Sequence, residues 1–476
     1  MKKFFSFLWR RGVTLFGAKP AYALGSEDLI REVIGYAFDR FKGKITKTSL
    51  KELQEKAESG DVESQYLFGL AHYFGAQEES GKIKKFVLDL FASDSVLREI
   101  KPHFSEALKW FRRAAERGHT SAQVVLATMY INGDGTERSY TDAVKWYEAA
   151  AKSGSVEAEY NLGAMYNFGM VSTAKDAAPL EARAWYQKAA DHGSPEALYA
   201  LGNMYYYGSG DGIISRDKNE ALQYFEKAAN QNYAPAQYMA GVIYLELREE
   251  EHSEEFWRSY YEWAKEMLEK AAEQQYAPAQ FLLSQHVGEA ESKELRLKAA
   301  EQGYAPAQLE IAQGYSSSDE EREEWYRKAA EQGDPEGQFR WAQYLEFKNL
   351  DGIPASDHED FSVLYRSAAN HGVAGAQIWL AGSYESSEQY ELAYKWYYLA
   401  SLSSLDRFSL SLVENSMAEL EKKDGLWGLW GNSKVSSEQV EKAKKDAKAM
   451  FDAIEQRKKR DKRRNIVFHS ALKKED

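Results

Sequence analysis

The chain has 476 residues, of which 44% are hydrophobic and 14% aromatic, so it holds enough apolar material for a continuous core. Its net charge of −13 argues against nucleic-acid binding by the main body, and the lack of cysteine excludes disulfides, thiolate metal sites and cysteine nucleophiles. No apolar run approaches the length that spans a bilayer, which excludes an ordinary transmembrane protein.

Residues 1–25 form a basic, aromatic N-terminal segment. Its basic start and apolar stretch indicate an export signal, but Arg10 and Arg11 divide the stretch into two short pieces. The alternatives are an interfacial segment that contacts anionic lipid and a plain packed or disordered terminus. We therefore expect a cytoplasmic protein, membrane association being left open and export to the periplasm being the alternative. The candidate membrane or partner contacts here are Phe4, Phe5, Leu8 and Trp9.

Residues 26–49 predict an N-terminal capping helix. Ser26 is a suitable N-cap, and Leu29, Ile30, Val33 and Ile34 follow at helical spacing. An apolar face of this kind is suited to covering the first unit of a repeat array.

One phrase recurs through residues 50–402: an aromatic residue, three further residues, two alanines and, after a turn, an Ala-Gln pair. It reads WFRRAAERGHTSAQ from Trp110 and WYRKAAEQGDPEGQ from Trp325. A fixed phrase at variable spacing indicates a helical repeat array whose loops differ in length. The second alanines of the pairs are Ala115, Ala151, Ala190, Ala229, Ala272, Ala300, Ala330 and Ala369.

The phrase also predicts how one helix ends and the next begins. Three residues after most second alanines comes a glycine, which ends a helix in the left-handed conformation without strain. Asn232 is a tolerated substitute, whereas Gln275 is not, so we expect strain or an altered cap at Gln275. The next helix carries a glutamine-like residue, a small residue four later and an aromatic seven later, as in Gln123, Ala127 and Tyr130. The small residue lets a neighbouring helix approach closely.

These residues resemble the Sel1-like repeat, a helix-turn-helix unit related to the tetratricopeptide repeat. The resemblance covers about nine to ten repeats in residues 50–402, with an insertion near 76–106 that predicts an extra helix. It implies an all-α fold, a right-handed α-solenoid with non-repeat helical ends. It further implies an adaptor or scaffold that binds a protein or peptide along a concave face.

The sequence offers little support for catalysis. The histidines show no pair at metal-ligand spacing, and the glycine-rich loops at 132–135 and 208–212 lack a P-loop lysine and an EF-hand glutamate. We therefore expect a non-enzymatic scaffold without metal or cofactor, either a monomer or a weak oligomer. Two alternatives stay open: a repeat-based hydrolase of β-lactam-like substrates, as described for some relatives, and a nucleic-acid-associated adaptor that uses the C-terminal tail.

A candidate binding surface follows from the positions that the repeat leaves variable. The residues two and five after the glutamine-like position vary freely and share a helix face. They are candidates for an exposed binding stripe. The alternative is that they are solvated surface positions with no role in binding. The candidate protein-binding residues are Asn161, Asn203, Gln285, Gln313, Arg340, Gln343 and Trp379.

The C-terminal part departs from the repeat. Residues 403–439 predict a capping region in which Trp427 and Trp430 form either an exposed contact patch or a buried lid. Residues 440–476 predict a basic helix and tail with 13 basic and 7 acidic residues. This charge would attract RNA, membrane phosphate or an acidic partner, or it complements the negative end of the helix. The basic tail consists of Arg457, Lys458, Lys459, Arg460, Lys462, Arg463 and Arg464.

Overall fold

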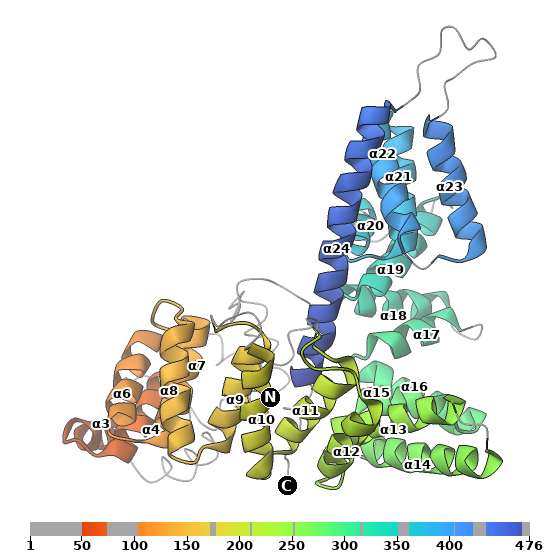
Figure 1. Ribbon diagram of the computed structural model, residues 1–476. Coiled ribbons are helices and arrows are strands. Elements are labelled where there is room, and N and C mark those ends of the chain that lie inside the picture. The colour runs from red at the N-terminus through yellow and green to blue at the C-terminus, as the bar shows by residue number, and fades with distance from the viewer. Residues whose placement is uncertain are drawn as a thin grey trace, which may run out of the picture. The chain divides into compact units, whose positions relative to one another are not determined.

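Every regular element in the described part of the chain is a helix, which confirms the predicted all-α class (Figure 1). The computed structural model describes residues 50–73, 103–171, 178–209, 212–250, 253–314, 318–350, 361–403, 405–421 and 435–468, without the side chains of 349–350 and 459–468. The predicted capping helix at 26–49 and most of the insertion near 76–106 lie outside these residues.

The chain divides into two compact units, and the boundary falls within α14 after Met267. Within each unit most helices pack against the next helix along the chain, as helix-turn-helix repeats require. The first unit contains α3 (Leu50–Glu58), α4 (Val62–Tyr73), α6 (Phe104–Glu116), α7 (Thr120–Asn132), α8 (Tyr140–Lys152), α9 (Val156–Asn167), α10 (Ala178–Asp191), α11 (Pro195–Tyr207), α12 (Lys218–Ala229), α13 (Ala234–Glu250) and most of α14 (Glu254–Glu273).

The second unit comprises residues Leu268–Arg463. The helices that follow α14 there are α15 (Ala277–Ser284), α16 (Glu289–Glu301), α17 (Ala305–Gln313), α18 (Asp319–Glu331), α19 (Pro335–Leu350), α20 (Phe361–Asn370), α21 (Ala374–Ser386), α22 (Tyr390–Ser401), α23 (Arg407–Glu421) and the greater part of α24 (Ser437–Phe468).

The turn between the paired helices has the left-handed residue that the sequence predicts. Gly193 adopts a φ of 92°, and Asn232 adopts 60° at the equivalent place. Gln275 is held at 59°, a conformation that costs an L-residue with a side chain roughly 1–2 kcal/mol. The predicted strain at Gln275 is therefore confirmed.

The recurrent glutamine ties the two helices of a repeat together. In six copies its Nε2 donates to the carbonyl oxygen of the second alanine, eight residues earlier; for Gln308 and Ala300 the distance is 2.9 Å. This carbonyl lies at the end of the preceding helix, where it also accepts from the amide of the turn residue three positions later, so the glutamine adds a second hydrogen bond that joins the two helices. The six glutamines are Gln65, Gln123, Gln237, Gln280, Gln308 and Gln377.

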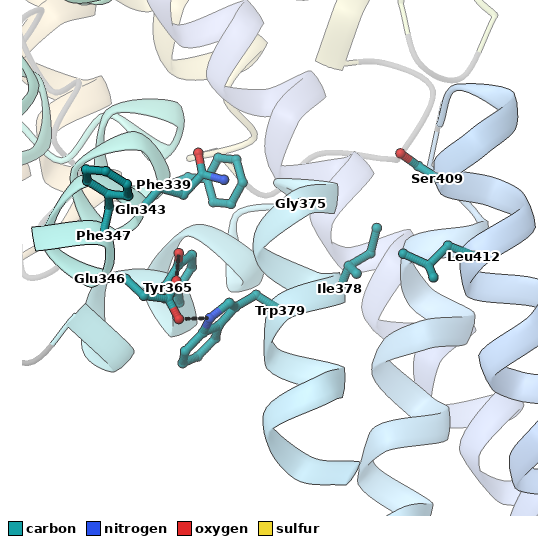
Figure 2. Close-up of a pocket in the computed structure, with 10 residues that line it drawn as sticks. All are labelled: Phe339, Gln343, Glu346, Phe347, Tyr365, Gly375, Ile378, Trp379, Ser409 and Leu412. Carbon is teal, nitrogen blue, oxygen red and sulfur yellow. Dashed lines mark hydrogen bonds between the residues drawn. The ribbon is translucent and has the colours of Figure 1, made fainter. Parts of the chain in front are cut away.

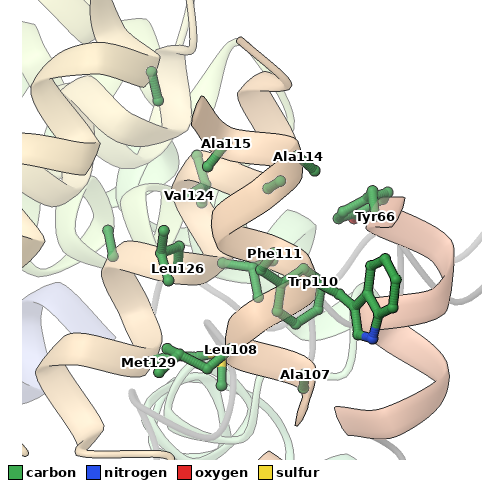
Figure 3. Packing of buried hydrophobic residues seen from close by; sticks show 14 of the residues in the cluster. Tyr66, Ala107, Leu108, Trp110, Phe111, Ala114, Ala115, Val124, Leu126 and Met129 are labelled. Atoms are coloured by element: carbon green, nitrogen blue, oxygen red, sulfur yellow. The ribbon is translucent and has the colours of Figure 1, made fainter. Parts of the chain in front are cut away.

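Small residues admit an aromatic ring from the following repeat. A Cβ built on Gly163 would lie 2.6 Å from Cδ1 of Tyr186, which is fully buried. A Cβ built on Gly69 would likewise lie 2.8 Å from Cδ1 of Phe111. Figure 3 shows the Phe111 ring inside a cluster that includes Leu126 of α7, and at these positions a repeat thus inserts a ring against the repeat before it.

Candidate functional site

The predicted binding stripe is buried in the first unit. Asn161 and Asn203 are only 4% and 3% exposed, so the expectation that these two side chains reach solvent is wrong. Asn161 lies in the middle of α9, which packs against α8 and α10, and Asn203 lies in α11, which packs against α10 and α12. Positions that vary in sequence are enclosed there because neighbouring helices cover both sides.

In the second unit the predicted residues lie nearer the surface. Gln285 is the exposed C-cap of the short helix α15, and Gln313 is the exposed last residue of α17. Gln343 and Trp379 line a single pocket. Arg340 lies beside it and donates through Nη1 to Oε1 of Gln343 at 3.3 Å. The structure therefore brings together three of the seven predicted residues.

The pocket has a volume of about 510 Å³ and lies entirely within the second unit. Figure 2 shows side chains of α19 on one side and of α23 on the other, with α21 between them. It is lined by Phe339, Gln343, Glu346, Phe347, Tyr365, Gly375, Ile378, Trp379, Ser409 and Leu412.

Helical spacing explains the α19 side of the pocket. Phe339, Gln343 and Phe347 are four residues apart, so they share one face of the helix. A Cβ on Gly375 would lie 2.5 Å from Cζ of Phe339, which shows how closely α21 approaches α19. A glycine is needed there because any larger residue would displace the ring.

Two stacked rings and a carboxylate form the polar part of the pocket. The rings of Tyr365 and Trp379 have centroids 3.9 Å apart and an interplanar angle of 11°. Glu346 accepts hydrogen bonds from both, from Nε1 of Trp379 at 3.0 Å and from Oη of Tyr365 at 2.6 Å. Burial, and secondarily the bond to Glu346, raises the pKa of Tyr365, so the phenol stays a donor at neutral pH.

Large apolar side chains are exposed at the pocket. Phe347 is 63% exposed and Leu412 is 47% exposed. The sequence-based prediction did not include them, nor Glu346 or Tyr365. The four-residue spacing from Phe339 to Phe347 was a usable signal for the α19 side. Leu412 gave no such signal, since it lies beyond the repeats.

The basic helix α24 contacts the C-terminal end of α20 and the turn that follows it. Nη1 of Arg457 donates to the carbonyl oxygen of Asn370 at 3.3 Å, and Lys458 pairs with Glu455 at 3.2 Å. Ile454 lies against the turn at Gly372. The first part of the basic tail therefore packs along the last residues of α20.

Several predicted contacts lie outside the described residues and remain predictions. The aromatic and basic residues concerned are Phe4, Phe5, Leu8, Trp9, Trp427 and Trp430, together with the side chains of Lys459, Arg460, Lys462, Arg463 and Arg464. Across the described ranges, no three His, Asp or Glu side chains gather in a way that could hold a metal ion. No helix among those described combines the length and apolarity needed to cross a bilayer.

Comparison with known proteins matches the repeats to one family. The model of the Sel1 repeat matches residues 100–119, 120–155, 156–194, 195–233, 323–334 and 367–404. A search of curated proteins finds no match. Between the matched segments, Gln280 and Gln308 make the same bond to the second alanine as the matched repeats do.

Solved structures include similar chains. A Sel1 repeat protein from Oxalobacter formigenes is 26% identical, with 72% of this chain and 92% of that chain covered and a TM-score of 0.46. A protective antigen of uropathogenic Escherichia coli, described as displaying an SLR fold, is 23% identical, with 90% and 98% covered and a TM-score of 0.39. An immunity protein from Pseudomonas aeruginosa is 22% identical, with 57% and 81% covered and a TM-score of 0.29. On its repeated phrase, its helix pairs and the family match, the chain contains several Sel1 repeats.

Proposed function

We propose that the protein is a non-enzymatic adaptor that holds an extended segment of a partner protein in the pocket lined by α19, α20, α21 and α23. The observation that carries this proposal is the exposure of Phe347 and Leu412 on opposite sides of the pocket. Apolar side chains gathered around a concavity are typical of a binding surface, whereas single exposed apolar residues are not informative.

The size of the pocket favours a peptide segment over a folded domain. A volume of about 510 Å³ accommodates one or two side chains, and pockets of this size bind small groups in many proteins. Repeat arrays use their surfaces in this way, because the stacked helices fix the positions of side chains that come from different repeats.

The test is selection of a random peptide library on the full chain, followed by affinity measurement on the best peptide. Burying one large apolar side chain contributes about 1.5–3 kcal/mol, or roughly 10- to 100-fold in affinity. We therefore expect Phe347→Ser and Leu412→Ser each to weaken binding at least about tenfold. Phe347 is mostly exposed and Leu412 about half exposed, so the fold should tolerate the changes.

Phe408 supplies the matched control. It lies on α23, is 80% exposed and does not line the pocket, so Phe408→Ser should leave affinity unchanged. If no peptide is selected, or if selected peptides bind both pocket variants as well as the wild type, the proposal is wrong.

A further inference from the structure

The pocket contains a single charged side chain. Of its ten lining residues only Glu346 bears a charge at neutral pH, and the others are aromatic, aliphatic or neutral polar. Its two oxygens are held in place by donors from different helices, Trp379 on α21 and Tyr365 on α20. The position of the negative charge is thus fixed by the fold.

No basic side chain in the described ranges compensates this charge. The two basic residues of α19 are engaged elsewhere: Arg340 pairs with Glu336 at 2.8 Å, and Lys348 pairs with Glu323. Glu346 forms no ion pair among the described residues. A purely apolar occupant would remove water from this carboxylate without replacing its interactions, which is unfavourable. A cationic occupant would replace the lost interactions of the carboxylate with water.

The surroundings of Glu346 also suit a cation. The rings of Phe347 and Trp379 border the same space, and aromatic faces attract cations, whereas the ring of Phe339 already has the guanidinium of Arg340 at 5.3 Å from its centroid. Ile378 offers an apolar surface along which the alkyl part of a long basic side chain can lie. The pocket therefore matches a side chain that is apolar along its stem and charged at its tip.

Geometry favours a guanidinium group over an ammonium group. Each oxygen of Glu346 accepts one hydrogen bond within the described part of the chain, and a carboxylate oxygen has the capacity to accept a second. A planar guanidinium can use both remaining positions at once, whereas an ammonium cannot match them with parallel bonds.

We propose that the pocket recognises an arginine side chain flanked by apolar residues in an extended partner segment. Glu346 binds the guanidinium, and Phe347 and Leu412 contact the flanking apolar side chains. This inference rests on the proposed adaptor function and adds to it the chemistry of the partner.

The test uses four synthetic peptides, Gly-Ser-Phe-Leu-X-Leu-Phe-Ser-Gly, in which X is arginine, citrulline, norleucine or glutamate. Citrulline has nearly the shape of arginine without its charge. Binding to the full chain is measured by calorimetry at low and high salt. We expect the arginine peptide to bind at least about tenfold more tightly than the citrulline peptide, with the difference shrinking as salt rises.

Two variants assign the preference to the pocket. Glu346→Gln should reduce the difference between arginine and citrulline to less than about twofold, since it removes the charge and keeps the size. Glu385→Gln is the matched control, because Glu385 also accepts a hydrogen bond from a tyrosine, Tyr397 at 3.1 Å, but does not line the pocket. It should keep the full arginine preference.

The outcomes separate this inference from the adaptor function. If all four peptides bind equally and binding still requires Phe347, the adaptor stands and the arginine preference is refuted. A preference for arginine that persists in Glu346→Gln also overturns the inference. If none of the four binds while library selection yields other peptides that depend on Phe347, the inference is likewise overturned and the adaptor function again stands.

Discussion

Replacing Gln308 by leucine tests the bond that joins the two helices of a repeat. Gln308 is 2% exposed and loses two hydrogen bonds in this exchange, its own to Ala300 and one that it accepts from Nε2 of Gln332 at 2.8 Å. Neither partner is left without a bond. The Ala300 oxygen still accepts from the amide of Gly303 at 2.9 Å, and Gln332 still donates to the carbonyl of Lys328 at 2.9 Å.

The expected cost follows from this accounting. Two net hydrogen bonds contribute about 2 kcal/mol, without the larger penalty of a buried group that has no partner. Greater burial of apolar surface by leucine offsets up to about 1 kcal/mol. The free energy of unfolding should therefore fall by between about 1 and 2 kcal/mol.

Hydrogen exchange, together with urea unfolding, is the appropriate assay, since a repeat array need not unfold as one two-state unit. Amides of α17 and α18 should lose protection in Gln308→Leu, while those of α7 should not. Gln313→Leu, at the exposed end of α17, is the control and should change little. A stability within about 0.3 kcal/mol of the wild type, or equal loss of protection in α7, would show that the glutamine does not serve as a helix tie.

Three further exchanges test other parts of the fold. Gln275→Gly should raise the urea midpoint, with a gain of roughly 0.5–1 kcal/mol, because glycine relieves the left-handed strain at some entropic cost; an unchanged or lower midpoint would contradict this. Gly163→Ala should destabilise by about 1–3 kcal/mol in the same assay, because the new methyl group meets the Tyr186 ring, and an unaffected midpoint would count against that contact. Burial raises the pKa of Asp134, although Asn132 and Tyr73 donate hydrogen bonds to it, so ionisation of this carboxyl opposes folding. Asp134→Asn should therefore be more stable than the wild type near pH 7, and its advantage should shrink as pH falls from the raised pKa of the folded state to the usual carboxyl range; a constant difference between pH 3 and 7 would refute this.

The sequence by itself predicted the helix pairs and the turns between them. These features depend on residues close together in the chain: the glutamine and the alanine carbonyl that it binds are eight residues apart. The left-handed conformation at Gln275 could likewise be predicted, because a turn of fixed length imposes it whichever residue is present. Local geometry of this kind repeats wherever the phrase repeats.

The candidate site was predictable only in part. Gln343 and Trp379 were identified as positions that the repeat leaves variable, but the same reasoning selected Asn161 and Asn203, which are buried. Variation in sequence shows that packing does not dictate a residue type. It does not show whether a neighbouring helix covers the position.

The pocket itself was decided by tertiary structure. Glu346 meets Tyr365 and Trp379, which follow it by 19 and 33 residues on two other helices, and Leu412 comes from a helix beyond the repeats. Repeat periodicity carries no information on such contacts, because it describes what the copies share. A fixed carboxylate among exposed apolar side chains arises only where particular copies differ and the fold brings those differences together.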